Sequence, residues 1–115
     1  MHIKWVLGAK TMKEAHEIMK PFTLEGHLEN MKCPYLVMHG GHDVLTVSAA
    51  RKTYDYAKMH GVDATLRILE PDETGAEHCQ HDNPTIGQEI LADWLADRFG
   101  IDQRKLLKTS YNPLI

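Results

Sequence analysis

The sequence predicts an α/β fold in which two parallel strands are flanked by helices. Three observations support it: a helix–strand–helix–strand–helix order, a short apolar run of strand length at residues 35–39, and a segment at residues 62–69 that alternates apolar and polar residues. A helix between two strands is typical of a crossover that joins parallel neighbours. Both strands would then end at the same edge of the sheet.

Residues 1–31 are predicted to be a helical segment that precedes the sheet. Thr11 and Glu14 have the spacing of a capping box, in which each side chain binds a backbone amide at the start of a helix. Apolar residues then recur at helical spacing until Pro21 ends the helix. Residues 22–31 are expected to form a connector or one short helical turn.

The first predicted strand is followed at once by two glycines and a carboxylate. Its apolar run is bounded by Pro34 and Gly40, as in strands buried on both faces of a parallel sheet. Gly40 and Gly41 allow a sharp turn before Asp43. Because ligands of open α/β sheets bind beyond the carboxyl ends of the strands, we expect Asp43 at the functional edge.

The rest of the chain continues the same pattern. A helix over residues 48–59 is ended by Gly61, and residues 62–69 alternate apolar and polar, as a strand with one exposed side does. A polar loop over residues 70–82 leads to a helix that begins at Pro84 and closes at Gly100. Its apolar stripe contains Ile86, Ile90, Leu91, Trp94, Leu95 and Phe99. Residues 101–115 are assigned to a carboxyl-terminal tail.

Composition excludes several classes of protein. The 115 residues make one domain or part of one, and a net charge of −3 without a basic stripe gives no reason to expect nucleic acid as a partner. The apolar runs are far shorter than the ~20 residues that span a bilayer, so no membrane partner is expected. Two cysteines and no secretion signal favour a cytoplasmic protein.

Asp43 and His78 are the candidate catalytic residues. His78 follows the second strand, 35 positions after Asp43, so the two are predicted neighbours at one edge of the sheet. A carboxylate beside an imidazole fixes its tautomer and stabilises the imidazolium, which makes the histidine an oriented general base.

A nucleophile for that base is missing. The sequence has no Gly-x-Ser-x-Gly elbow, and its serines, Ser48 and Ser110, are not in a strand-to-helix turn. Cys33 precedes the first strand, at the opposite end of the sheet. Cys79 follows His78 directly, but no pattern places it opposite the imidazole.

From about residue 31 to residue 99 the sequence resembles the carboxyl-terminal part of an α/β-hydrolase. The segment LVMHGGHD at 36–43 is similar to the penultimate strand and acid loop of that superfamily. GAEH at 75–78 and ADWL at 92–95 resemble its histidine loop and final helix. The branch it resembles comprises prolyl-oligopeptidase-like and dienelactone-hydrolase-like esterases, including hydrolases that cleave carbon–carbon bonds.

This resemblance implies a function. Asp43 would be the triad acid and His78 the general base, residues 32–100 would be the carboxyl-terminal part of the domain, and no cofactor or metal would be needed. Because the family order is Ser, Asp, His, the nucleophile would lie upstream, and the chain would be an inactive fragment of a serine hydrolase acting on an ester or ketone. The early strands, the elbow and the oxyanion loop of the family are absent from it.

Two alternatives remain open. In the first, histidines and carboxylates of the two loops bind zinc and form a hydrolytic site. Neither loop has a known spacing of metal ligands. The residues concerned are His39, His42, Asp43, His78, His81 and Asp82. The chain could also be a non-catalytic oligomerising module. In the hydrolase arrangement the first strand has an open edge, so we expect a homo-oligomer or association with the missing amino-terminal half.

Overall fold

The computed structural model describes residues 2–105, so residues 106–115 of the predicted tail, Ser110 among them, lie outside the described part. The elements in chain order are α1 (His2–Val6), α2 (Met12–Met19), η1 (Leu28–Asn30), β1 (Tyr35–Gly40), α3 (Val47–Met59), β2 (Ala64–Leu69), η2 (Pro71–Glu73), η3 (His78–Gln80) and α4 (Pro84–Phe99). The helix predicted to begin at Thr11 and to end before Pro21 is α2.

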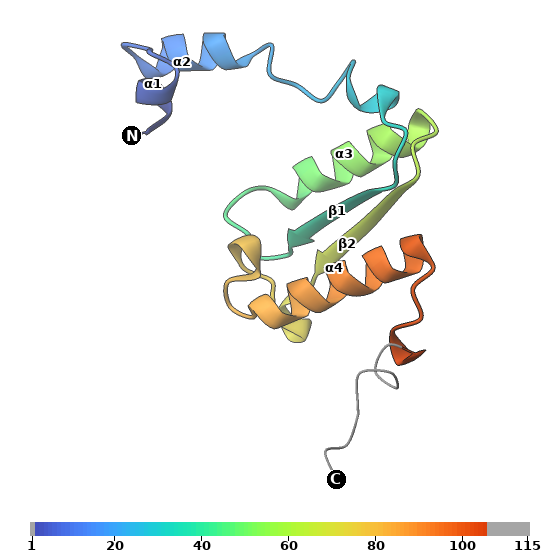
Figure 1. Cartoon of the computed structure of the whole chain (residues 1–115). Coiled ribbons are helices and arrows are strands. Elements are labelled where there is room, and N and C mark those ends of the chain that lie inside the picture. Colours follow the sequence, from blue (N-terminus) through green and yellow to red (C-terminus); the bar gives the residue numbers. More distant parts are fainter. Residues whose placement is uncertain (1, 106–115) are drawn as a thin grey trace.

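The sheet consists of two parallel strands with a helix on each face (Figure 1). The register pairs Tyr35 with Ala64 at one end and Gly40 with Leu69 at the other. Ala64 packs with residues of α3, whereas the indole Nε1 of Trp94 in α4 donates to Thr65 Oγ1 at 3.1 Å. Because successive strand residues face opposite sides, α3 and α4 cover opposite faces. The predicted α/β arrangement is confirmed.

The prediction that β2 has an exposed side is wrong. Its end residues, Ala64 and Leu69, are buried and the four residues between them are half-buried. The polar residues of the alternating sequence bind protein groups and not solvent alone. The guanidinium of Arg67, for example, donates to the Glu73 carboxylate and to the Ile68 carbonyl. Polar residues of β2 thus have partners on the face covered by α4.

The helix ends follow the predicted signals, with one difference. Thr11 Oγ1 accepts the Glu14 amide at 3.1 Å, but Glu14 Oε2 accepts the amide of Lys10 at 2.8 Å and not that of Thr11. Gly61 and Gly100, with φ of 76° and 65°, follow the ends of α3 and α4 in left-handed conformation. Glycine adopts this conformation without a Cβ clash.

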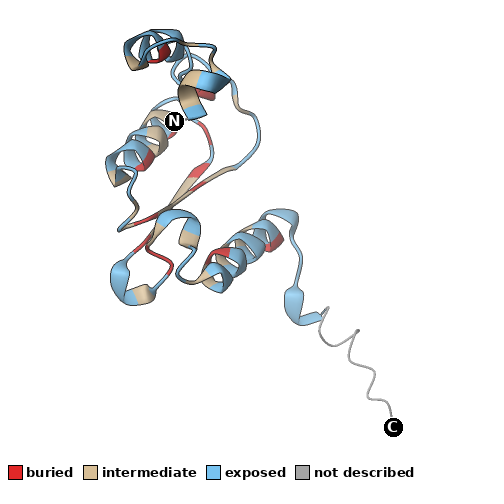
Figure 2. Cartoon of the chain, turned by 90° about the vertical axis from the view of Figure 1, so that its left-hand side faces the viewer, coloured by how far each residue is buried: buried red, intermediate tan, exposed pale blue. Residues whose placement is uncertain are grey.

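The hydrophobic core is small (Figure 2). Its main cluster joins Leu28, Ala57, Val62 and Ala64. The apolar stripe of α4 is only partly covered, because Phe99 is 74% exposed, and α1 and α2 stand away from the sheet (Figure 1) with Trp5 83% exposed. None of the helices within residues 2–105 has both the length and the apolar character needed to cross a membrane.

Gly40 is the point where the chain after β2 crosses the end of β1. A Cβ atom built on Gly40 would lie 2.2 Å from the carbonyl oxygen of Ala76, which is far inside van der Waals contact. Two residues on, the His42 amide donates to that same carbonyl at 2.9 Å. A glycine at position 40 therefore allows the loops after the two strands to meet.

We expect Gly40→Ala to lower the free energy of unfolding by about 3 kcal/mol, because overpacking against a backbone atom forces the loop to move. Urea unfolding measures the change. Gly87→Ala is the matched control: its Cβ would meet only the flexible Gln80 side chain, and alanine favours helix by about 1 kcal/mol. Equal unfolding midpoints for Gly40→Ala and the unsubstituted chain would show that this close approach is not a constraint.

Candidate functional site

Asp43 lies in a tight turn directly after β1. Its amide donates to the Gly40 carbonyl at 3.2 Å, and its Oδ1 accepts the amide of Leu45 at 2.8 Å. The carboxylate is almost fully shielded from solvent, with 4% of the side chain exposed. The turn therefore fixes the carboxylate at the carboxyl end of the sheet, where the sequence placed it.

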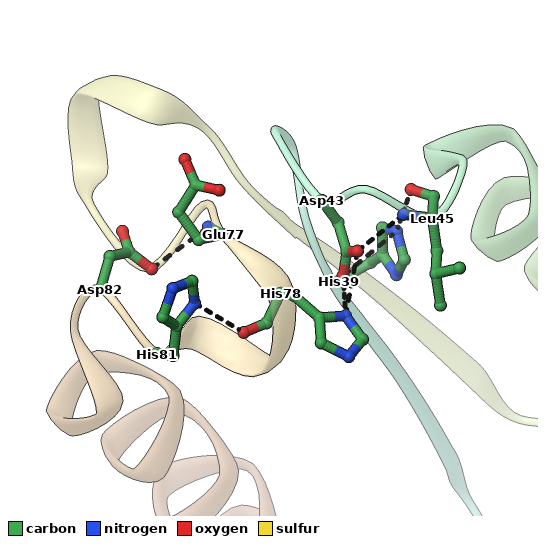
Figure 3. Close-up of polar contacts among 7 residues, drawn as sticks. All are labelled: His39, Asp43, Leu45, Glu77, His78, His81 and Asp82. Carbon is green, nitrogen blue, oxygen red and sulfur yellow. Dashed lines mark hydrogen bonds and ion pairs between the residues drawn. The ribbon is translucent and has the colours of Figure 1, made fainter. Parts of the chain in front are cut away.

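His78 faces this carboxylate from the loop after β2 (Figure 3). Its Nδ1 lies 3.0 Å from both Oδ1 and Oδ2 of Asp43, which confirms the predicted proximity. An ionised carboxylate can only accept, so Nδ1 carries the proton, and Nε2 of the neutral ring is a free acceptor. Half of the imidazole, 51%, is exposed to solvent. The pair is thus a shielded acid behind an accessible base.

The surroundings of Asp43 lower the pKa of its carboxyl group. The Leu45 amide has the largest effect, burial opposes it, and the imidazoles of His78 and His39 lower the pKa further. The net result is an ionised Asp43, which is the form that can orient His78 and stabilise its imidazolium.

The loop that carries His78 is held by two side chains that the sequence offered as metal ligands. Asp82 accepts the Ala76 amide on Oδ2 and the Glu77 amide on Oδ1, each at 3.1 Å. The Nδ1 of His81 lies 3.0 Å from the His78 carbonyl, and it must donate because a carbonyl oxygen only accepts. Asp82 and His81 thus position the loop backbone around His78.

An open hollow of about 250 Å³ lies beside the pair. It is lined by Met38, His39, Asp43, Leu45, His78, Cys79 and Gln80. A larger hollow of about 340 Å³ is lined by Cys33 and Pro34, which precede β1, and lies at the opposite end of the sheet. Cys33 is therefore far from the imidazole, as predicted, and Cys79 is the residue with a nucleophilic group among those lining the first hollow.

The described residues provide neither a serine near His78 nor a set of metal ligands. Ser48 is exposed in the first turn of α3 and is not among the residues that line the hollow beside His78. Within residues 2–105, no three His, Cys, Asp or Glu side chains are grouped so that they could hold a metal ion. The exposed His42 joins the site through its backbone amide only.

His39 is the site residue whose role sequence reasoning missed. The sequence offered it only as a possible zinc ligand, whereas its Nε2 lies 3.2 Å from the Leu45 carbonyl oxygen and 3.9 Å from Asp43 Oδ2 (Figure 3). The signal available in the sequence is a histidine at the end of a strand, four residues before a carboxylate and separated from it by two glycines and His42.

Comparisons with protein-family models, curated proteins and solved structures found no match. The geometry of the Asp43–His78 pair is therefore the observation that bears on function.

We expect Asp82→Asn to destabilise the chain at neutral pH, because the two amides bind separate oxygens and an asparagine has one. Burial raises the pKa of Asp82, but amides led by that of Glu77 outweigh it, so the folded-state pKa lies below its ordinary 3.8. The contribution of the ionised carboxylate to the free energy of unfolding is then fully present above pH 3.8. It is lost as the pH falls through the folded-state pKa.

Urea unfolding at pH 7 and at several values below pH 3.8 measures this dependence. The stability difference between the unsubstituted chain and Asp82→Asn should shrink with acidification, whereas the exposed Asp72→Asn in the same loop should show little difference at any pH. A constant difference for Asp82→Asn would contradict a role of its ionised form in holding the loop.

Proposed function

We propose that the chain supplies the acid and the base of a serine hydrolase, with residues 32–100 forming the carboxyl-terminal part of an α/β-hydrolase domain. Asp43 is the triad acid and His78 the general base. The serine nucleophile lies upstream, outside the 115 residues. The substrate is a small ester or a ketone cleaved at a carbon–carbon bond, and the reaction uses no metal or cofactor.

One observation carries the proposal. The shielded Asp43 carboxylate lies 3.0 Å from His78 Nδ1, while Nε2 is left as an acceptor on a half-exposed ring beside an open hollow. A purely structural ion pair has no need to leave one ring nitrogen free and accessible. The order along the chain, an acid after one strand and a histidine after the next, is also that of the α/β-hydrolases it resembles.

The geometry suits proton transfer at Nε2. When a hydroxyl attacks the substrate carbonyl, Nε2 accepts its proton and the ring becomes an imidazolium. Nδ1–H continues to donate to Asp43, whose negative charge stabilises the new positive charge. When the tetrahedral intermediate collapses, the bond from the carbonyl carbon to the leaving group breaks and Nε2–H gives its proton to that group.

The zinc alternative receives less support from the same contacts. Both oxygens of Asp82 already accept backbone amides, so Asp82 would have to give up these bonds to become a ligand. Within residues 2–105, no three His, Cys, Asp or Glu side chains are grouped so that they could hold a metal ion. The sequence has no Gly-x-Ser-x-Gly elbow, so the chain alone is proposed to be inactive.

In the enzyme that contains the complete domain, His78→Ala should lower kcat by on the order of 10⁴-fold, because it removes the base. Asp43→Asn should cost as much or less, since it disturbs only the orientation and charge of the ring. Steady-state kinetics on p-nitrophenyl esters measures both effects.

His81→Ala is the matched control, because it removes an imidazole from the same loop without removing the base. It should have a far smaller effect on kcat. If His81→Ala abolished turnover while His78→Ala did not, the base would be misassigned. Ester turnover by the 115-residue chain that His78→Ala abolishes would disprove that the nucleophile lies elsewhere.

The open edge of β1 suggests an oligomer or association with the amino-terminal half. Among the described residues β1 pairs with β2 on one side only, so backbone groups on its other side are free to pair with a further strand. We expect the chain to sediment as a dimer or larger species at micromolar concentration. A compact monomer that unfolds cooperatively would contradict both this partner and the proposal that the sheet is incomplete.

A further inference from the structure

The loop that carries Asp43 has little apolar packing to hold it. Val44 is 84% exposed and Leu45 is 59% exposed. Polar contacts must therefore fix the loop, and two of them are internal: the Asp43 amide to the Gly40 carbonyl, and the Leu45 amide to Asp43 Oδ1.

A third contact ties the loop to the sheet. The imidazole of His39 in β1, of which 17% is exposed, has its Nε2 3.2 Å from the carbonyl oxygen of Leu45. Because a carbonyl oxygen only accepts, Nε2 carries the proton and donates it. In the part of the chain that the structure describes, it is the one side-chain hydrogen bond from β1 to the backbone of residues 44–46.

The same peptide segment connects this bond to the acid. The carbonyl of Leu45 is held by His39, and the amide of Leu45 donates to Asp43 Oδ1 at 2.8 Å. A fixed Leu45 backbone therefore fixes the position of the amide that donates to the Asp43 carboxylate. His39 Nε2 is 3.9 Å from Asp43 Oδ2, too far for a direct hydrogen bond.

We propose that His39 is a positioning residue for the triad acid: through the Leu45 backbone, its Nε2–H holds the turn that aims Asp43 at His78. The proposal rests on the function proposed above and adds a second histidine with a different role. His78 exchanges protons at Nε2, whereas His39 keeps its Nε2 proton as a fixed donor.

Substitutions can separate a donor role from a charge role. The amide nitrogen of glutamine reaches about as far as the Nε2 of histidine and donates without carrying charge, so His39→Gln should preserve the tie. His39→Leu removes the donor. His39→Asn, with a shorter side chain that does not reach Leu45, provides the same test if the leucine variant is unfolded. His42→Leu is the matched control, because His42 is exposed in the same loop.

Carbon-detected NMR titration of the Asp43 carboxyl group in the 115-residue chain is the readout. The amide of Leu45 is the largest cause of the lowered pKa of Asp43, and the two imidazoles that face it are those of His39 and His78. The pKa of Asp43 should rise toward its ordinary value in His39→Leu and His39→Asn. It should rise less in His39→Gln, which keeps the donor and loses only the charge of the imidazole, and it should stay at the unsubstituted value in His42→Leu.

Equal pKa values of Asp43 in the unsubstituted chain and in His39→Leu would overturn the proposal. An equal rise in His39→Gln and His39→Leu would also overturn it, because the effect would then come from the charge of the imidazole. The titration needs no turnover, so it can fail while His78 still proves to be the base. Likewise, a failed hydrolase assay would leave a measured effect of His39 on Asp43 intact.

Discussion

The close approach of two backbones at Gly40 is the constraint on which the candidate site depends. The Ala76 carbonyl occupies the space that a Cβ of residue 40 would fill, and it accepts the amide of His42. This contact joins the backbone of the loop after β1 to that of the loop after β2. Asp43 follows His42 and His78 lies two residues after Ala76, so the contact brings acid and base together across 35 positions of sequence.

Around that contact, backbone amides offset the cost of shielding carboxylates from water. Burial of an unpaired carboxylate is unfavourable. Asp43 receives the amide of Leu45, and Asp82 receives those of Ala76 and Glu77, so each stays ionised with a lowered pKa. One carboxylate then orients the imidazole, and the other holds the loop that presents it.

The sequence predicted the parts of the fold that depend on periodicity and chain order. Strand lengths, the helix between them and the turn at Gly40 were enough to place Asp43 and His78 at one edge. The roles of His39 and Asp82 could not be predicted, because they depend on which backbone groups the folded loops present. The burial of β2 was also mispredicted. An alternation of apolar and polar residues does not show that helices cover both faces of the strand, as α3 and α4 do here.

The most direct test of an oriented base is the tautomer of His78, measured by nitrogen-15 NMR of the chain at a pH where the ring is neutral. The geometry predicts a proton on Nδ1 and a bare Nε2 for His78, and the opposite tautomer for His39, whose Nε2–H binds a carbonyl. The two rings therefore serve as references for one another. A neutral His78 with its proton on Nε2 would contradict the account, because that nitrogen could then not accept a proton from a nucleophile.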